Sequence, residues 1–431
     1  MNPAYKHTKW REKLIKLTPG QLVIQITDHC NAKCPQCSMR VTSDFKRHTL
    51  NRKEVFRMID ATGAMGIKAV SFTGGEPFLL QDDLCAYIDR AGQNHIPFIR
   101  TGTNGFMFAG HNRPGFMDKI TRLADRLAAT PLRNFWISLD SFKPEIHERM
   151  RGFKGVVDGI SKALPIFQDA GIYPSVNLGI NRNLGGQLTQ DLNPRDFNSA
   201  RAYETAVYHT YSRAFSQFYE QVIELGFTIV NACYPMSIES GCNGLEAVYQ
   251  ASTTADIVRY TKNEKRMVFR ALGDCIGKYR DRIRIFSPQS ALNALAGENN
   301  KDIDFSSPCL GGINYFFVDS AKGDTFPCGY RGRDNFGKFW KMKGALRPVE
   351  KNCRCCDWEC FRDPSELIAP VLDLLSSPLG LAKQISKNPG HYVRWAKDLR
   401  YYPRCDYFDG RKAPDYKRMA GVKKNSGLTE F

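Results

Sequence analysis

The run Thr27-Asp28-His29-Cys30-Asn31-Ala32-Lys33-Cys34-Pro35-Gln36-Cys37 places three cysteines within eight residues. Thiolates are preferred ligands of iron–sulfur clusters, zinc and Cu(I). A cubane [4Fe–4S] cluster has four irons, so three cysteines would leave one iron open to another ligand. The preceding residues 21–27 are apolar and β-branched and predict a short strand. The cysteines are therefore expected on a loop at the C-terminal end of a strand, where barrel enzymes place their chemistry.

A second motif follows the next predicted strand. Residues 69–73 read as this strand, and Gly74, Gly75, Glu76 and Pro77 come directly after it. Paired glycines allow a backbone to approach a ligand closely. A carboxylate such as that of Glu76 can accept hydrogen bonds from an ammonium group.

A Cys-x3-Cys-x2-Cys loop followed about forty residues later by Gly-Gly-Glu-Pro resembles the radical S-adenosylmethionine (SAM) superfamily. The resemblance implies that Cys30, Cys34 and Cys37 hold a [4Fe–4S] cluster whose open iron binds SAM, and that residues 74–77 contact the methionyl amine. It also implies reductive cleavage of SAM to a 5′-deoxyadenosyl radical, with a reductant such as flavodoxin or ferredoxin. The alternative is a structural zinc loop beside an unrelated glycine turn.

Strand-like and helix-like segments alternate from residue 21, as repeated βα units do. The resemblance implies an α/β fold, a partial (β/α)6 TIM-like barrel. The polar stretch 181–210 interrupts the alternation and is expected to be a substrate lid or an inert surface loop. The predicted strands are 21–27, 68–73, 97–102, 134–139, 174–180 and 227–231, and the predicted helices 51–66, 81–94, 115–127, 155–170 and 212–225.

The resemblance extends to further SAM-binding positions after the third, fourth and fifth strands. Asn104 follows the third strand, Ser138 ends the fourth, and Asn177 lies in the fifth. Arg151 matches an Arg-Gly pair that contacts the SAM carboxylate in relatives, and a guanidinium suits such a group. Without this frame, Ser138 would be a helix cap and Arg151 a solvated charge. Gln36 departs from the family, which usually has an aromatic residue there.

A second group of cysteines occupies the C-terminal part of the chain. Residues 314–319 and 322–327 predict a β-hairpin with a glycine turn. A hairpin beside a dense cysteine cluster resembles the auxiliary-cluster domain called SPASM or its shorter twitch form, although the later cysteines are more closely spaced than in that family. We predict one auxiliary [4Fe–4S] cluster, with a zinc knuckle as the alternative. The predicted ligands are Cys309, Cys328 and two of Cys353, Cys356 and Cys360, with Cys353 and Cys360 preferred; Cys85, Cys233, Cys242 and Cys275 are expected to be buried free thiols.

The charge lies mainly at the two ends of the chain. The 431 residues carry a net charge of +17. Residues 1–17 have five Lys/Arg and one Glu, and residues 377–431 have twelve Lys/Arg and five Asp/Glu, which gives +4 and +7. This distribution does not predict a nucleic-acid channel through the core.

The predicted organisation has five parts. The residues between the barrel and the hairpin are expected to be a helical connection, and the last part a basic, aromatic tail. The parts are a basic N-terminal segment at 1–20, the barrel at 21–235, the connection at 236–300, the auxiliary-cluster domain at 301–363, and the tail at 364–431.

Within the tail, residues 391–402 predict a helix on which Tyr392, Trp395 and Leu399 share one face. Basic residues beside these aromatic side chains would suit an anionic membrane surface. The alternative is an ordinary helix that closes the barrel and exposes a charged face.

These features leave three hypotheses for the function. The first is oxidative modification or crosslinking of a peptide or protein side chain, and the second is modification of a lipid, sugar or other small molecule at a membrane surface. The third is a non-catalytic iron–sulfur or zinc protein. Fourteen cysteines and no apolar signal segment indicate a cytoplasmic protein, with a peripheral position on the inner membrane face as an extension of the second hypothesis.

Overall fold

The computed structural model describes residues 18–37, 45–235, 245–248, 256–297, 309–342, 353 and 356–424. Most of the basic segment 1–20 lies outside these residues, as do Cys242 and Cys355. The strands are β1 Gln21–Thr27, β2 Ala69–Gly74, β3 Phe98–Thr103, β4 Asn134–Leu139, β5 Ser175–Gly179, β6 Ile229–Cys233, β7 Arg284–Ile285, β8 Tyr315–Val318 and β9 Thr325–Phe326.

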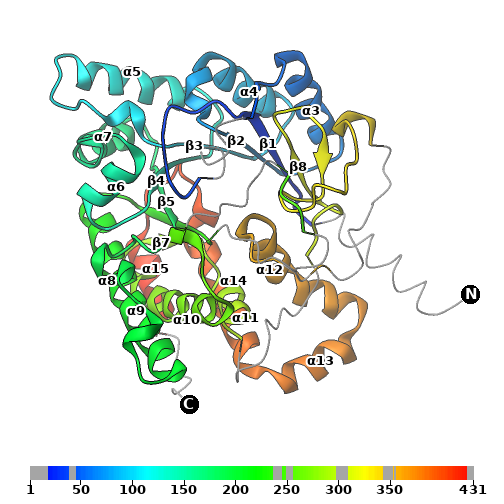
Figure 1. Ribbon diagram of the computed structural model, residues 1–431. Helices are drawn as coiled ribbons and strands as arrows, with labels where there is room; N and C mark the ends of the chain where they lie inside the picture. The colour runs from blue at the N-terminus through cyan, green and yellow to red at the C-terminus, as the bar shows by residue number, and fades with distance from the viewer. Residues whose placement is uncertain are drawn as a thin grey trace, which may run out of the picture.

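These strands form one curved sheet in the order β7-β6-β5-β4-β3-β2-β1-β8-β9. β1 to β7 are parallel, β8 pairs in parallel with β1, and β9 pairs antiparallel with β8. Within the described part of the chain β7 and β9 do not pair, so the barrel stays open (Figure 1). The predicted partial barrel and the predicted hairpin are confirmed. The segment called a connection also contributes β7 to the sheet.

The strands are buried on both faces, and each face has a different chemistry. On β1, Leu22, Ile24 and Ile26 point outward into the main hydrophobic core. Gln21 and Gln25 alternate with them and point into the barrel, where they line a cavity. Because side chains alternate along a strand, one strand can supply apolar residues to the core and polar residues to the interior.

Helices cover the outer face of the sheet (Figure 1). One differs clearly from its prediction: α9 begins at Ala200 instead of 212. Ser199 caps it, because its Oγ accepts a hydrogen bond from the backbone N–H of Ala202 at 3.2 Å. The last third of the expected insertion, residues 200–210, therefore forms the first turns of a long helix. The helices are α3 Arg52–Ala64, α4 Gln81–Gln93, α5 Phe116–Ala128, α6 Pro144–Arg151, α7 Val156–Asp169, α8 Gln187–Gln190, α9 Ala200–Glu224, α10 Lys262–Tyr279 and α11 Gln289–Ala296.

The C-terminal segment packs on the open side of the barrel. It forms α12 Glu359–Ser376, α13 Pro378–Lys387, α14 Pro389–Arg404 and α15 Tyr416–Lys424. The Tyr401 hydroxyl accepts a hydrogen bond from the backbone N–H of Ile285 in β7 at 2.9 Å, and the Tyr402 hydroxyl donates to Phe286 O at 2.6 Å. The helix α14 therefore covers the β7 edge, as the structural alternative for the tail proposed.

The buried face of α14 differs from the predicted one. Tyr392 is buried and Trp395 Nε1 donates to Leu367 O at 2.8 Å, but Leu399 is 40% exposed. Asp398 lies inward in its place. Its carboxylate accepts hydrogen bonds from Arg280 Nη2 at 2.6 Å and from the backbone N–H of Ser290, at the N-terminus of α11, at 2.8 Å. The charged partner and the helix N-terminus make burial of this acidic side chain favourable.

This pair gives a stability prediction. The change Asp398→Ala leaves the Arg280 guanidinium buried without its partner, so we expect a loss of about 3–5 kcal/mol in the free energy of unfolding. Chemical denaturation followed by circular dichroism measures it. The neighbouring exposed change Leu399→Ala is the control, with an expected effect within about 0.5 kcal/mol. Similar effects of the two changes would show that Asp398 does not anchor the tail.

Candidate active site

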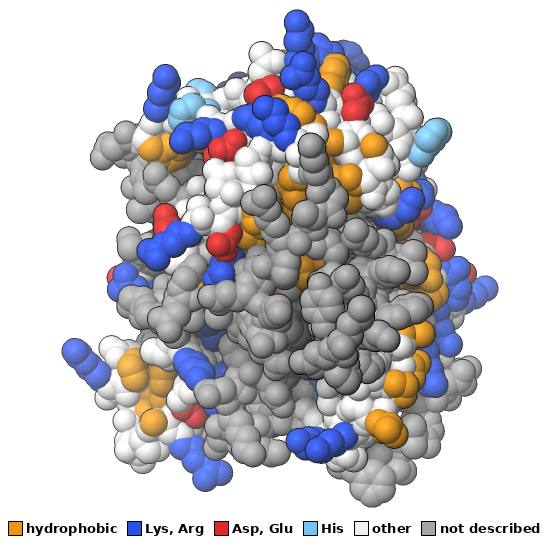
Figure 2. Space-filling view, turned by 90° about the vertical axis from the view of Figure 1, so that its right-hand side faces the viewer, with side chains coloured by type: hydrophobic (Ala, Val, Ile, Leu, Met, Phe, Trp, Pro, Cys, Tyr) orange, Lys and Arg blue, Asp and Glu red, His pale blue; other side chains and the backbone are white. Residues whose placement is uncertain are grey.

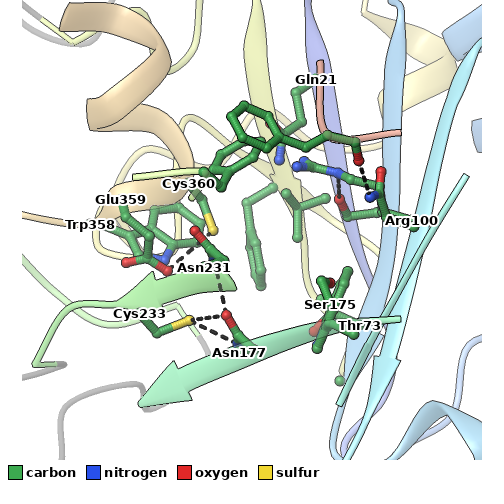
Figure 3. Close-up of a pocket in the computed structure, with 18 of the residues that line it drawn as sticks. Gln21, Thr73, Arg100, Ser175, Asn177, Asn231, Cys233, Trp358, Glu359 and Cys360 are labelled. Carbon is green, nitrogen blue, oxygen red and sulfur yellow. Dashed lines mark hydrogen bonds between the residues drawn. The ribbon is translucent and has the colours of Figure 1, made fainter. Parts of the chain in front are cut away.

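A cavity of about 300 Å³ occupies the barrel interior. The inward positions of β1 to β6 line one side, and Trp358, Glu359 and Cys360 at the start of α12 line another (Figure 3). Gly102 leaves room for the Trp136 indole, whose Nε1 lies 2.0 Å from where a Cβ of residue 102 would stand. The polar residues from the strands are Gln21, Gln25, Ser71, Thr73, Arg100, Asn134, Ser175, Asn177 and Asn231.

The cysteine loop lies at the C-terminal end of β1. Cys30 is exposed, Cys34 is buried, and Cys37 lines the cavity. The backbone N–H of Cys37 donates to Cys34 O at 3.1 Å, which turns the loop so that both side chains stay near the barrel mouth. Burial raises the pKa of the Cys34 thiol to about 12; Arg151 lowers it, and Asp140, Cys37 and Cys30 raise it. The three thiols are thus close enough to act on one another.

The Gly-Gly-Glu-Pro segment is a backbone strap for this loop. The backbone N–H of Gly75 donates to Thr27 O at 2.8 Å, and that of Glu76 donates to His29 O at 2.9 Å. A Cβ on residue 74 would lie 2.0 Å from Thr27 O, and one on residue 75 would lie 2.1 Å from His29 O. Glycine is therefore required at both positions by close approach. Pro77 begins a 3-10 turn, Pro77–Leu80, whose first two residues are buried, directly after the strap.

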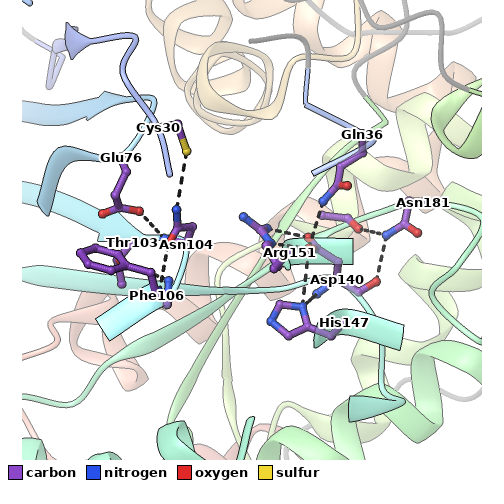
Figure 4. A network of polar contacts seen from close by, with 12 residues as sticks. Cys30, Gln36, Glu76, Thr103, Asn104, Phe106, Asp140, His147, Arg151 and Asn181 are labelled. Carbon is purple, nitrogen blue, oxygen red and sulfur yellow. Dashed lines mark hydrogen bonds and ion pairs between the residues drawn. The ribbon is translucent and has the colours of Figure 1, made fainter. Parts of the chain in front are cut away.

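Glu76 faces the protein interior (Figure 4). Its carboxylate accepts hydrogen bonds from the backbone N–H groups of Phe78 at 3.1 Å and Asn104 at 2.6 Å. Burial raises the pKa of Glu76 to about 7, against the effect of these two bonds. Asn104 Nδ2 in turn donates to Cys30 Sγ at 3.6 Å and to Asn31 Oδ1 at 2.9 Å. Glu76 therefore links the strap to the end of β3, and Asn104 extends the link to the first cysteine.

Arg151 lies beside the cysteine loop and is held there by Asp140 (Figure 4). Its Nε and Nη2 donate to the two oxygens of Asp140 at 2.6 and 2.9 Å. Burial alone would raise the pKa of Asp140, but Arg151 and then His147 hold that pKa well below its usual range. Gln36 Nε2 donates to the same carboxylate at 3.0 Å. The residue that departs from the family pattern thus ties the cysteine loop to the end of β4.

Of the remaining predicted SAM positions, Ser138 and Asn177 both lie on the inward side of their strands. Their backbones pair in register between β4 and β5. Asn177 is already engaged, because its Nδ2 donates to Cys233 Sγ at 3.1 Å and its Oδ1 accepts from Asn231 Nδ2 at 3.0 Å.

The structure brings four of the later cysteines together and separates the fifth from them. Burial raises the pKa of the Cys328 thiol well above its usual value, and the nearby thiols raise it further. The backbone N–H of Cys309 donates to Cys353 O at 3.0 Å, which joins the two halves of the group. The thiols that surround one small cavity are those of Cys309, Cys328, Cys353 and Cys356.

Cys360 instead lines the barrel cavity, although it was preferred as a ligand. It lies in the first turn of α12, where Glu359 Oε1 accepts from its Sγ at 3.6 Å. Cys233, expected to be a plain buried thiol, faces the same cavity. Burial raises the pKa of Glu359 to about 7, and its hydrogen bonds oppose the rise. Sequence spacing could not separate Cys356 from Cys360, because the start of α12 decides which way each one points.

A local hydrogen bond is made to four of the grouped cysteines, Cys30, Cys309, Cys328 and Cys356. The backbone N–H two residues later donates to the sulfur of Cys30, Cys309 and Cys328, each at 3.4 Å. Trp358 N–H does the same for Cys356 and lowers the pKa of that thiol, against a larger rise from burial. Such bonds favour thiolate, the form that binds metal, and tune iron–sulfur clusters. Each of the two predicted clusters thus has at least one cysteine with such a donor.

Comparisons with known proteins agree with this geometry. Residues 24–181 match the family model of the radical SAM superfamily. The chain is 28% identical to the "Probable GTP 3′,8-cyclase" of Thermococcus kodakarensis over 37% of this chain and 48% of that protein. It is 27% identical to the "Fe-coproporphyrin III synthase" of Methanosarcina barkeri over 37% of each chain. In these two comparisons the match spans about half or less of the relative's own length.

Two solved structures were also found to be similar. Streptococcus suis SuiB bound to S-adenosylmethionine has a TM-score of 0.48 at 17% identity, over 75% of this chain and 64% of that one. The anSMEcpe enzyme with bound AdoMet has a TM-score of 0.47 at 15% identity, over 78% and 82%. The family assignment depends on the family model and on the cysteine loop that it includes. Residues 24–181 of this chain belong to the radical SAM superfamily.

Proposed function

We propose that this protein is a radical SAM enzyme with two iron–sulfur clusters that oxidises a substrate bound inside the barrel. The observation that carries the proposal is the convergence of three elements at the cavity mouth. These are the cysteine loop, the glycine strap that holds it, and the Asp140–Arg151 pair. When bound, a [4Fe–4S] cluster and SAM supply a 5′-deoxyadenosyl radical that removes a substrate hydrogen, and an auxiliary cluster supplies an electron acceptor.

The residues at the mouth would bind and orient SAM. Cys30, Cys34 and Cys37 would hold the cluster, and Arg151 would face the SAM carboxylate with the N–H groups that Asp140 does not use. The bidentate contact with Asp140 fixes the plane of the guanidinium, so that its orientation does not depend on SAM. Because Glu76 is already bonded to two backbone N–H groups, we assign it the role of positioning the strap. The backbone of residues 74–77 would then meet the methionyl amine, and Ser138 and Asn177 the rest of SAM.

The auxiliary cluster would be held by Cys309, Cys328, Cys353 and Cys356. These four thiols line one small cavity. Four cysteines are the ligand set of a [4Fe–4S] cluster and also of a structural zinc ion. The iron content of the protein, described below, separates these two alternatives.

A second cluster suits a net oxidation better than an isomerisation. Trp358 lines both the barrel cavity and the cavity between the four cysteines. The two sites thus share the Trp358 side chain as part of their walls, and its ring packs against Phe361 with ring centroids 4.7 Å apart. A substrate in the barrel would lie close to the auxiliary site.

The substrate is more compatible with a small molecule than with an extended peptide. A cavity of about 300 Å³ is at the small end of ligand sites. The names of the two relatives, a GTP cyclase and a synthase of Fe-coproporphyrin III, also favour a small molecule. Modification of one peptide side chain that reaches into the barrel is the competing version. To distinguish these two substrate classes, the protein is incubated with the peptide fraction and with the small-molecule fraction of a cell extract. The fraction that raises 5′-deoxyadenosine release above background contains the substrate.

Iron content tests both ligand sets. We expect about eight irons per chain in anaerobically prepared protein, from two four-iron clusters. The change of Cys30, Cys34 and Cys37 to Ala should leave about four irons and abolish 5′-deoxyadenosine formation; Cys356→Ala should also lower iron to about four. Cys360→Ala is the matched control, because Cys360 is four residues after Cys356 but lines the barrel cavity, and it should keep the full iron content. If Cys360→Ala loses iron and Cys356→Ala does not, the auxiliary ligand set is wrong.

SAM affinity tests the role of Arg151. Loss of a charged hydrogen-bond donor costs roughly 1.5–3 kcal/mol, so Arg151→Ala should weaken SAM binding about 10- to 150-fold. Arg151→Lys keeps the charge beside Asp140 and should give an intermediate affinity. Equilibrium dialysis on iron-loaded protein measures both variants. Arg149→Ala, an exposed position on the same helix, is the control and should bind SAM normally. Unchanged affinity in Arg151→Ala would place the carboxylate site elsewhere.

We also propose that the corner between α12 and α13 contacts an anionic membrane surface. Leu374, Leu375 and Leu379 are 56%, 61% and 87% exposed there, and Lys383 and Lys387 follow on α13. Figure 2 shows the side of the molecule on which this corner lies, where apolar and basic side chains are neighbours in the lower part of the view. None of the described helices has the length and hydropathy to cross a bilayer. Contact would thus be peripheral, by leucine insertion and lysine attraction.

Vesicle co-sedimentation tests this surface. We expect the protein to pellet with vesicles containing phosphatidylserine at low salt and much less with neutral vesicles or at high salt. The combined change of Leu374, Leu375 and Leu379 to Ser should weaken binding about 10-fold or more, because it removes the apolar anchor. Met117→Ser, exposed on α5, is the control. Equal pelleting of the two variants, or none of the wild type, would contradict membrane contact at this corner.

A further inference from the structure

Arg100 is a charged residue deep in the cavity wall that the proposed SAM and cluster sites do not use. It is the third residue of β3, in register with Ser71 on β2 and Asn134 on β4. All three side chains line the cavity. Phe286 and Phe408 line the same cavity and belong to segments outside the strands, and Arg100 is the one cation among the described residues that line it.

Among the described residues, the guanidinium of Arg100 has a hydrogen-bond partner at one nitrogen. Its Nε donates to Ser71 Oγ at 3.1 Å. In the described part of the chain, no carboxylate is paired with it, and Nη1 and Nη2 donate to no acceptor. Figure 3 shows Glu359, the acidic residue of the cavity, apart from Arg100 on another wall.

Three other arginines show how a guanidinium in this interior is compensated. Arg151 is paired with Asp140, and Arg280 with Asp398, although Arg280 Nε has no acceptor among the described residues. In the part of the chain that the structure describes, Arg284 has no carboxylate partner, but its three nitrogens donate to Thr228 O, Asp409 O and Thr228 Oγ1 at 2.8–3.2 Å. Each of these three thus has either a carboxylate or a full set of oxygen acceptors, as the cost of burying a charge requires.

Burial lowers the pKa of Arg100, yet an arginine in a protein stays protonated. A positive charge thus faces the cavity with two N–H₂ groups available. That fork matches the paired oxygens of a carboxylate or a phosphate. The Ser71 hydroxyl accepts from Arg100, so its own proton remains available to a third oxygen.

The depth of Arg100 and Ser71 below the cavity mouth determines how long a ligand anchored there can be. Ser71 lies three residues before Gly74, which lines the cavity beside Cys37 at the mouth. At about 3.3 Å per strand residue, the two levels are roughly 10 Å apart. A ligand anchored at Arg100 could therefore extend a carbon chain or ring toward the mouth.

We propose that Arg100 and Ser71 form an anion-binding subsite, and that the substrate is an elongated small molecule with a terminal carboxylate or phosphate. This anion binds at Arg100, and the opposite end of the molecule lies at the level of Gly74 and Cys37, where hydrogen abstraction would occur. The inference builds on the proposed function, because it assigns the substrate class for the same cavity.

The test uses iron-loaded protein with saturating SAM and no reductant, so that SAM occupies its own carboxylate site and no turnover occurs. The probes are inorganic phosphate, succinate and the uncharged succinamide, and the measurement is the thermal midpoint and the binding isotherm. We expect succinate or phosphate, but not succinamide, to stabilise the wild type, and the stronger of the two identifies the anion. Arg100→Met should weaken that binding at least about 10-fold, and Arg100→Lys less. Arg122→Met, exposed on α5, is the matched control and should bind as the wild type does.

Stability without a probe separates this role from a structural one. Because Arg100 is uncompensated, Arg100→Met should melt at or above the wild-type temperature. A lower melting temperature, equal protection by succinamide, protection that persists in Arg100→Met, or no protection of the wild type by either anion would each overturn the subsite.

The proposed function is judged separately. SAM cleavage by the reduced wild type without substrate should persist in Arg100→Met. If the wild type cleaves SAM but anions do not bind at Arg100, only the subsite is wrong. If the wild type fails to cleave SAM, the proposed function is wrong, even where anions bind.

Discussion

The backbone contact between the β1 and β2 loops is the constraint on which the candidate site depends. Gly75 and Glu76 donate to Thr27 O and His29 O, and both glycines are packed too closely for a side chain. The contact continues the β1–β2 pairing beyond the strands and thereby fixes the start of the cysteine loop. From the same strap, Glu76 reaches the backbone of Asn104, and Asn104 reaches Cys30. Three adjacent strand ends are thus joined before any cofactor is considered.

A second constraint is the handling of charge in the interior. The Asp140 carboxylate accepts hydrogen bonds from Arg151 and Gln36. The Asp398 carboxylate accepts them from Arg280 and from a backbone N–H at the N-terminus of α11, so both of these buried carboxylates have several donors. One network orients a residue at the mouth of the barrel, and the other attaches the C-terminal helices to its open side. Both use the same chemistry for different purposes, and only the first lies near the proposed cofactors. Arg100 is different because its compensating oxygens are missing from the described protein, which is the property expected of a binding site and not of a structural pair.

The sequence predicted the parts of the fold that depend on local pattern. The six barrel strands and the hairpin agree with alternation, turn residues and β-branched composition. Contacts between distant segments could not be predicted in this way. Leu399 was placed on the buried face of α14, but Asp398 lies inward because Arg280 and α11 supply its partners. The inward position of Arg100 was not predicted, although the alternation along β3 puts Arg100 on the same side of the strand as Gly102.

The two chemically similar cysteines Cys356 and Cys360 show how one helix start divides a motif between two sites. Cys356 precedes α12, in extended chain, and can turn toward Cys328. Cys360 lies in the first turn of α12, where the helical backbone fixes the direction of its side chain. On this helix the side chain points into the barrel cavity. Trp358 lies between them and lines both cavities. Its large apolar ring forms part of the wall of each cavity. Two cysteines that are only four residues apart therefore belong to two neighbouring sites and not to one.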